Sequence, residues 1–263
     1  FFKQKTAYEI YQCDWSSDVC SSDLKYYKWQ ARLATPLVKY TAAENAVYYA
    51  RMNMQIMGGV GYMKEYHAEK LLRDALIMPI YEGTSQIQAL MVLKDHLQYA
   101  MRNPALFFSK IAQTKLLSLT AKTESEKKLY KLKSIYYSAM QTIMTRILID
   151  KFGDLKGKPI VEWKSAFLQE WDAKKDYSFG LLNAEKFCLI ASRLWMSKAL
   201  VKQTLKITDE KIKQERIKIC DNFMHRCEAK MKGWLLEIES SKEFSHLLVH
   251  KEFCDNYKEM SNN

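Results

Sequence analysis

Glu82 occupies a position at which a carboxylate could act as a general base. It stands in a tight turn, Ile80-Tyr81-Glu82-Gly83, which follows an apolar stretch and directly precedes the expected start of a helix. A carboxyl group held against apolar neighbours loses water, and this loss raises its pKa toward the range that proton transfer near neutral pH requires. The same position also suits an exposed glutamate that stabilises a helix N-terminus. The residues alone leave both interpretations open.

Two adjacent glycines, Gly58 and Gly59, follow an amide side chain, Gln55, at the expected end of a helix. Bare backbone beside an amide can form hydrogen bonds to a phosphate or to a ring edge at close range. The stretch lacks the third glycine and the preceding strand of a dinucleotide-binding fingerprint, and no Gly-Lys-Ser/Thr of a phosphate-binding loop follows it. A glycine that only ends a helix is the competing interpretation.

The elements that position these residues are predicted to be helices. Thr35-Pro36 predicts a helix over 36–57, because threonine is a frequent cap, proline favours the first turn and apolar residues then recur at steps of three and four. The glycines end this helix. A short helix over about 66–74, an apolar connector over 75–80 and a helix from Thr84 or Ser85 to about residue 100 follow.

The composition favours an all-α protein. The 263 residues are rich in helix formers, hold 8 glycines and 4 prolines, and are 48% apolar, which suffices for a sizeable core and excludes a disordered chain. No apolar run is long enough to span a membrane. The 6 cysteines are scattered, a pattern that disfavours a disulfide scaffold and fits a reducing compartment.

Asn103-Pro104 is the best candidate for an internal boundary. Residues 104–263 carry 29 Lys and Arg against 20 Asp and Glu, and we expect a second helical domain there. Its helices are predicted at about 105–119, 124–152, 159–172, 180–206, 209–239 and 242–257. Aromatic residues spaced by four or eight are typical of a core-facing helix side: Trp163, Phe167 and Trp171, and Phe187 and Trp195.

Residues 1–24 differ from the rest of the chain. They contain Ser-Ser-Asp twice, at 16–18 and 21–23, and follow neither a helical nor a strand period. The segment resembles a translated sequencing adapter, so we assign it no function and expect the native sequence to begin near Lys25.

One histidine-cysteine pattern invites a metal interpretation. His246, His250 and Cys254 recur every four residues and could hold zinc on one helix face. No second ligand group of convincing spacing accompanies them, so a packed or surface face is favoured and no metal site is predicted.

Three blocks in order support a family resemblance: Gln55-Ile56-Met57-Gly58-Gly59-Val60-Gly61-Tyr62, Leu72-Arg73-Asp74-Ala75 and Ile80-Tyr81-Glu82-Gly83-Thr84-Ser85-Gln86-Ile87-Gln88. These blocks and their spacing resemble the C-terminal helical domain of the acyl-CoA dehydrogenases, over about residues 33–98. The resemblance implies a partial helical bundle of that type over 25–103, followed by a helical extension over 104–263.

The resemblance implies a role for the Glu82 turn. In this family the carboxylate at the position of Glu82 removes the α-proton of an acyl-CoA thioester, and a hydride leaves the β-carbon for FAD, which yields a trans-2-enoyl-CoA. The backbone N–H at the same position and a ribityl hydroxyl of FAD stabilise the developing enolate. Gly83 would then line the substrate site beside the thioester. Arg73-Asp74 would position the turn through an ion pair or capping contacts.

The resemblance also implies a cofactor and partners. Thr84 and Gln86 match positions that contact FAD, whereas Gln55, Gly58 and Gly59 match positions that reach the FAD of a neighbouring subunit. A homodimer or homotetramer follows, with an electron-transferring flavoprotein as the usual electron acceptor. We expect a bacterial, cytoplasmic enzyme. The family's N-terminal helical and middle β domains are absent here, so the chain is expected to be an inactive C-terminal fragment of an active parent.

The basic extension suggests an alternative function. One relative in this family implicated in DNA protection has a basic C-terminal helical region, so a flavin-containing relative whose extension binds DNA or a membrane surface is the second prediction. Acidic residues interrupt the densest basic stretch, which favours a solvated face over contact with nucleic acid, anionic lipid or the CoA phosphates. That stretch consists of Lys206, Lys211, Lys213, Arg216 and Lys218.

Overall fold

The computed structural model describes residues 21–102, 104–155 and 177–241, and within these ranges the chain forms helices and no strand. The all-α prediction is confirmed. The elements are α2 (Ser21–Met57), the 3-10 helix η1 (Gly58–Tyr62), α3 (His67–Ala75), α4 (Ser85–Arg102), α5 (Pro104–Thr120), α6 (Glu124–Leu155), α8 (Ser178–Thr204) and α9 (Glu210–Ser240). The helices predicted at 159–172 and 242–257 lie outside the described residues. No helix in the described ranges is long and apolar enough to cross a bilayer.

The first helix begins earlier than the sequence predicts. α2 runs through Pro36 without a break, so the predicted start at Thr35-Pro36 is wrong. The Thr35 hydroxyl donates to the Ala31 carbonyl oxygen at 2.8 Å, as a threonine inside a helix does. Packing explains why the proline is tolerated, because apolar residues on both sides of it are buried. Upstream of the proline, Arg32 also forms an ion pair with the buried Asp95 of α4 at 2.9 Å.

Two helix boundaries follow their sequence signals closely. α2 ends where Gly58 adopts a φ of +63°, a conformation that costs a glycine little. Asp209 is the N-cap of α9, where its carboxylate accepts the backbone N–H of Ile212 at 3.1 Å. The first boundary confirms the predicted end of the helix at Gly58-Gly59, and α9 begins within one residue of the predicted start at 209.

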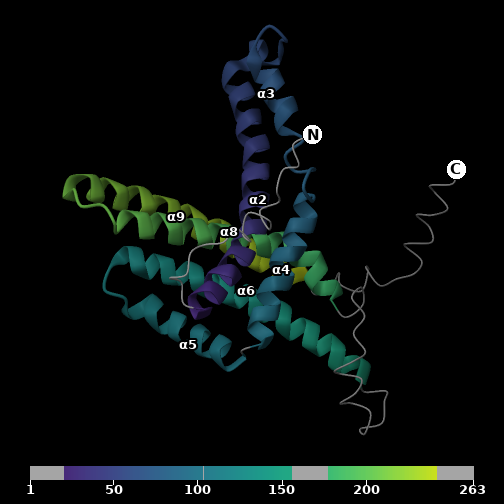
Figure 1. The fold of residues 1–263 in the computed structure, drawn as a ribbon, viewed down its shortest axis with the longest axis vertical. Coiled ribbons are helices and arrows are strands. Elements are labelled where there is room, and N and C mark those ends of the chain that lie inside the picture. The colour runs from purple at the N-terminus through teal and green to yellow at the C-terminus, as the bar shows by residue number, and fades with distance from the viewer. Residues whose placement is uncertain (1–20, 103, 156–176, 242–263) are drawn as a thin grey trace, which may run out of the picture.

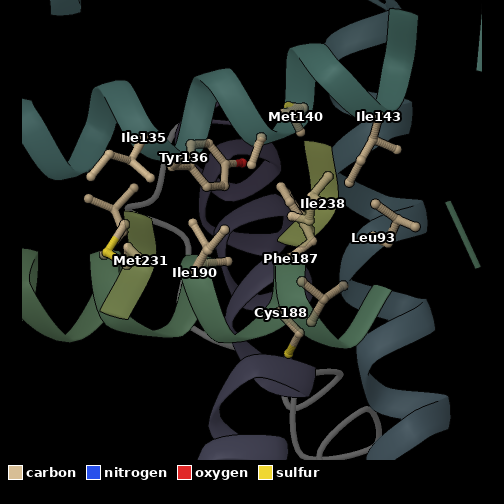
Figure 2. Packing of buried hydrophobic residues seen from close by; sticks show 14 of the residues in the cluster. Leu93, Ile135, Tyr136, Met140, Ile143, Phe187, Cys188, Ile190, Met231 and Ile238 are labelled. Atoms are coloured by element: carbon tan, nitrogen blue, oxygen red, sulfur yellow. The ribbon is translucent and has the colours of Figure 1, made fainter. Parts of the chain in front are cut away.

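One core joins the helices on either side of residue 103. Buried residues of α2 and α4 form a single cluster with buried residues of α6, α8 and α9. Phe187 of α8 is fully buried, and its ring centroid lies 5.5 Å from that of Tyr136 on α6 (Figure 2) and 5.7 Å from that of His96 on α4. Trp195 packs against the same cluster, which confirms the core interpretation of Phe187 and Trp195. The division into two domains near residue 103 stays a prediction.

A two-helix arm stands out from this core. Figure 1 shows the C-terminal half of α2 and the antiparallel α3 extending together away from the region where α4, α6 and α8 meet, with η1 joining them at the tip. Many large apolar side chains of the arm are exposed: Tyr48, Tyr49, Met52, Ile56, Val60, Tyr62, Met63, Tyr66 and Leu71. Large exposed apolar patches of this kind are typical of interaction sites.

Candidate active site

The Glu82 turn has an unusual backbone. Glu82 adopts a φ of +53° and Gly83 a φ of +91°, in the segment that joins α3 to α4. Glu82 is the only non-glycine residue with a positive φ in the described ranges. The positive φ favours glycine at position 83, and a Cβ there would lie 2.8 Å from Nε2 of Gln88, so that the amide end of Gln88 would have to shift. Strained backbone held by its surroundings is a feature of functional sites.

Hydrogen bonds from two helices hold this turn. The buried Gln88 of α4 donates from Nε2 to the Glu82 carbonyl oxygen at 3.0 Å. Lys39 of α2 donates from Nζ to the carbonyl oxygens of Met78 and Gly83, at 2.8 and 2.9 Å. Together these contacts fix the backbone of the turn against both helices, which compensates for the cost of the left-handed conformation at Glu82.

The N-terminus of α4 is fastened as well. The Ser85 hydroxyl donates to the Glu44 carboxylate of α2 at 2.5 Å, and the Ser85 backbone N–H donates to the Pro79 carbonyl oxygen at 2.9 Å. The Thr84 hydroxyl oxygen accepts the Ile87 backbone N–H at 3.4 Å, as a helix N-cap does. The helix start predicted at Thr84 or Ser85 is confirmed.

The side chain of Glu82 is exposed, as are those of Ile80 and Tyr81 beside it. The apolar shielding expected from the sequence is therefore not supplied by the described residues of this chain, because the neighbours of the turn also face solvent. Any exclusion of water from this carboxylate has to come from a surface that closes over the turn.

The backbone amide of Glu82 remains available. Among the described residues, the N–H groups of the turn that donate hydrogen bonds belong to Ile80, Tyr81 and Ser85, and the Glu82 N–H has no acceptor. An amide that is rigidly placed and unpaired can donate to an oxygen that gains negative charge. Glu82 therefore presents an acceptor of protons and a hydrogen-bond donor from one residue.

The second predicted group of residues lies at the tip of the arm. Gln55, Gly58 and Gly59 are exposed, and a Cβ at either glycine would meet no atom within 4 Å. Lys39 contacts the Glu82 turn from a position 16 residues before Gln55 on the same helix. At a rise of about 1.5 Å per residue, the two groups lie roughly 24 Å apart along α2. The structure therefore does not bring them together within one chain.

Gly61, which the sequence analysis did not single out, has the closest packing of the arm's glycines. Its Cβ position lies 2.8 Å from the Met54 carbonyl oxygen and 2.9 Å from the Met57 Cβ. Glycine is thus required where η1 folds back on α2, whereas Gly58 and Gly59 leave open space.

Arg73 and Asp74 lie near the end of α3, and the contacts of their side chains are weak. The Arg73 guanidinium is 4.0 Å from the Asp74 carboxylate and 3.3 Å from that of Glu69, and both members of the Arg73-Asp74 pair are exposed. Such pairs contribute little to stability. In the described ranges, the side-chain contacts to the Glu82 turn come from Lys39 and Gln88 and not from this pair.

The described residues contain no grouped metal ligands, and the basic stretch of α9 that the sequence singles out faces solvent. Within residues 21–102, 104–155 and 177–241, no three His, Cys, Asp or Glu side chains are grouped as metal ligands. The residues His246, His250 and Cys254 lie outside the described ranges, as do Trp163, Phe167 and Trp171. On α9, Lys211, Arg216 and Lys218 are exposed, and DNA or membrane binding stays a prediction.

Comparison with known proteins points to one family. Residues 24–97 match the family model described as "Acyl-CoA dehydrogenase, C-terminal domain". An acyl-CoA dehydrogenase of Bacillus subtilis is 50% identical over 58 residues, which cover 22% of this chain and 15% of the relative. The mitochondrial short-chain specific acyl-CoA dehydrogenase of Bos taurus is 42% identical over 89 residues, 34% of this chain and 20% of the relative. The chain thus spans no more than a fifth of these relatives.

A solved structure extends the likeness of fold. The crystal structure of an acyl-CoA dehydrogenase from Bacillus anthracis, complexed with FAD, aligns with a TM-score of 0.60 and 18% identity over 82% of this chain and 34% of that chain. Because residues 1–103 make up less than half of the chain, the similarity of fold continues into the helices after Pro104. Motifs and family model agree that residues 24–97 are similar to the C-terminal domain of the acyl-CoA dehydrogenase family.

Proposed function

We propose that this chain is the C-terminal part of an FAD-dependent acyl-CoA dehydrogenase in which Glu82 is the base. The supporting observation is the Glu82 turn itself. A non-glycine residue is held at positive φ by hydrogen bonds from α2 and α4, with its carboxylate and its backbone N–H both unpaired among the described residues. Such an arrangement fixes the two groups that the reaction needs.

Each group of Glu82 has a separate task. The carboxylate removes the proton from the α-carbon of an acyl-CoA thioester, and the electron pair of that C–H bond moves toward the thioester carbonyl. The Glu82 N–H then donates to the carbonyl oxygen as it gains charge. Gly83 keeps the wall beside the thioester free of side-chain atoms. Loss of a hydride from the β-carbon completes the trans-2-enoyl product.

Exposed residues beside the turn and others at the tip of the arm fit a bound flavin. Thr84 and Gln86 present a hydroxyl and an amide at the open N-terminus of α4, and Gln55, Gly58 and Gly59 present an amide and bare backbone over open space. When bound, FAD supplies the acceptor for the hydride. Thr84 and Gln86 would bind and orient it beside Glu82.

The distance between the two groups supports a shared site. Residues roughly 24 Å apart along α2 are poorly placed to hold the same part of one flavin, so Gln55, Gly58 and Gly59 would contact the FAD of a neighbouring subunit. The exposed apolar side chains of the arm supply the surface for such a contact. We therefore propose a homodimer or homotetramer, with an electron-transferring flavoprotein as its electron acceptor.

The exposure of Glu82 bears on the activity of this chain alone. Proton abstraction from a thioester depends on a site that excludes water, and the described residues leave the turn open. The 263-residue chain is therefore expected to be inactive without the domains that cover the turn in a full-length parent.

The test is Glu82→Gln in the full-length protein that contains this chain. The substitution removes the base but little volume, so FAD should stay bound while bleaching of the flavin absorbance by acyl-CoA slows at least about 100-fold. Glu215→Gln changes an exposed glutamate of α9, away from the turn and the arm, and should leave bleaching unchanged. Full activity of Glu82→Gln would refute the assignment of the base.

A further inference from the structure

Three lysines from three helices meet at a cavity far along the chain from the Glu82 turn. Lys110 of α5, Lys133 of α6 and Lys198 of α8 line a cavity of about 230 Å³ between these helices. Hydroxyl groups line it as well, among them those of the buried Thr114 and the half-buried Tyr137. Leu117 and Leu194 supply the apolar part of the lining, and most of the other lining residues carry hydrogen-bond donors or positive charges.

These lysines lack the acidic partners that other lysines of the bundle have. Lys128 on α6 lies 3.2 Å from the Asp221 carboxylate, for example. Among the ion pairs of the described residues, none involves Lys110, Lys133 or Lys198.

Aromatic and hydroxyl groups contact the three ammonium groups instead. The Lys110 ammonium donates to the Tyr99 hydroxyl at 2.9 Å. The Lys133 ammonium lies 4.2 Å from the Tyr130 ring centroid, and that of Lys198 lies 5.7 Å from the Trp195 ring centroid. Contacts of this kind attract the ammonium groups but supply no negative charge, so the net positive charge of the cluster is not neutralised.

The three charges repel one another. Lys198 is exposed as a residue, but the protein that removes water around its ammonium and the nearby charges of Lys133 and Lys110 lower its pKa from 10.5 to about 8. Burial also lowers the pKa of Lys133. At neutral pH the cluster is still cationic, and an anion in the cavity would relieve both the repulsion and the loss of water.

We propose that the cavity between α5, α6 and α8 binds a single compact phosphate group through Lys110, Lys133 and Lys198. Its volume is below the roughly 300–1,000 Å³ of pockets for drug-sized ligands and well above that needed for one water molecule. Lysine ammonium groups are point charges that approach from separate helices, which suits a tetrahedral dianion better than a planar carboxylate. The site is independent of the flavin and of the Glu82 turn.

A calorimetric titration of the full 263-residue chain tests the proposal. Inorganic phosphate and glycerol 3-phosphate are titrated at constant ionic strength, with chloride as the reference anion. Saturable binding of one phosphate group per chain is expected, and tighter binding of glycerol 3-phosphate would identify an esterified phosphate as the ligand, whereas tighter binding of inorganic phosphate would identify the free ion. Absence of saturable heat at millimolar concentrations of both probes overturns the proposal.

Matched variants separate a built site from general positive charge. Lys198→Gln and Lys133→Gln should each weaken phosphate binding at least about tenfold, because a charge-assisted contact is lost. Lys211→Gln and Lys218→Gln remove the same charge from exposed positions on α9 and should leave binding unchanged. Equal weakening by both pairs of variants would show diffuse attraction and would refute the site.

A measurement on the unmutated chain guards against misfolded variants. The pKa of Lys198, followed by NMR of its labelled side chain, should rise above about 8 when phosphate is present, because a bound dianion stabilises the ammonium. An unchanged pKa at saturating phosphate contradicts the proposal.

Discussion

Gln88 Nε2 donates a hydrogen bond to the carbonyl oxygen of Glu82 at 3.0 Å, and this contact links the first turn of α4 to the residue before Gly83. Gln88 is buried, whereas the Glu82 side chain is exposed. The buried amide thus holds the backbone of the exposed residue that we propose as the base. Gln88 is in this sense a positioning residue for Glu82.

Replacing Gln88 should therefore slow the reaction clearly while lowering the free energy of unfolding only slightly. Gln88→Met keeps the volume but loses the hydrogen bond, which should lower the free energy of unfolding by about 1 kcal/mol. In the full-length enzyme we expect a fall in kcat of about tenfold or more, with little change in KM, because a displaced base affects the chemical step. Steady-state kinetics and thermal unfolding check this. Gln141→Met on the exposed face of α6 is the control, and equal effects of the two would contradict the positioning role.

Two glycine-to-alanine substitutions should change the free energy of unfolding in opposite directions. At Gly83 the φ of +91° and the 2.8 Å approach to Gln88 Nε2 make alanine costly, by about 1–3 kcal/mol in the free energy of unfolding. Gly233 lies inside α9 with no atom within 4 Å of its Cβ position, so alanine there should stabilise by about 0.5–1 kcal/mol. Chemical denaturation of both variants measures the difference. A neutral Gly83→Ala would mean that the turn does not need its left-handed backbone.

The buried His96 should make stability depend on pH. Burial lowers its pKa from 6.5 to about 4, and its Nδ1 donates to the Val92 carbonyl oxygen at 2.7 Å. Folding favours the neutral ring over the charged one. The contribution of His96 to the free energy of unfolding is therefore constant above about pH 6.5, where the ring is neutral in both states. As the pH falls from 6.5 to 4, the unfolded chain takes up the proton first and about 3 kcal/mol is lost. The free energy of unfolding, measured at several pH values across this range, should depend less on pH in His96→Phe. The exposed His225→Phe should keep the pH dependence of the wild type. A wild-type curve with no slope there would contradict the burial effect.

Charge on the arm should disrupt assembly of the full-length protein. Ile56 is 82% exposed in this chain, so lysine at that position costs the isolated fold almost nothing. In an assembly that covers the arm, the buried lysine would be strongly unfavourable. Light scattering should therefore show smaller particles for Ile56→Lys. Leu119→Lys, on the equally exposed end of α5, should keep the wild-type mass, and dissociation of both variants would argue against a specific role of the arm.

The sequence was a good guide where local chemistry decides the structure. Glycine at 58 ends α2 and Asp209 caps α9, because positive φ and a free carboxylate act within a few residues. It was a poor guide at Thr35-Pro36, where a local start signal lies inside a helix that packing on both sides of the proline holds together. The local preference for starting a helix at Thr35-Pro36 is a few kcal/mol. The free energy gained by burying many side chains along α2 is larger, so the helix continues through the proline.

The motif residues and their family resemblance are evident from the sequence alone, because Gln55, Glu82 and the residues between them follow one another at a characteristic spacing. Only the tertiary structure decided which side chains hold the Glu82 turn in place and how far Gln55 lies from it. Lys39 lies 44 residues before Gly83, and no local pattern could pair them. The same holds for Lys110, Lys133 and Lys198, which three separate helices bring to one cavity. Contacts between distant segments depend on how amphipathic helices pack, and that packing is set by the whole core and not by any one stretch of chain.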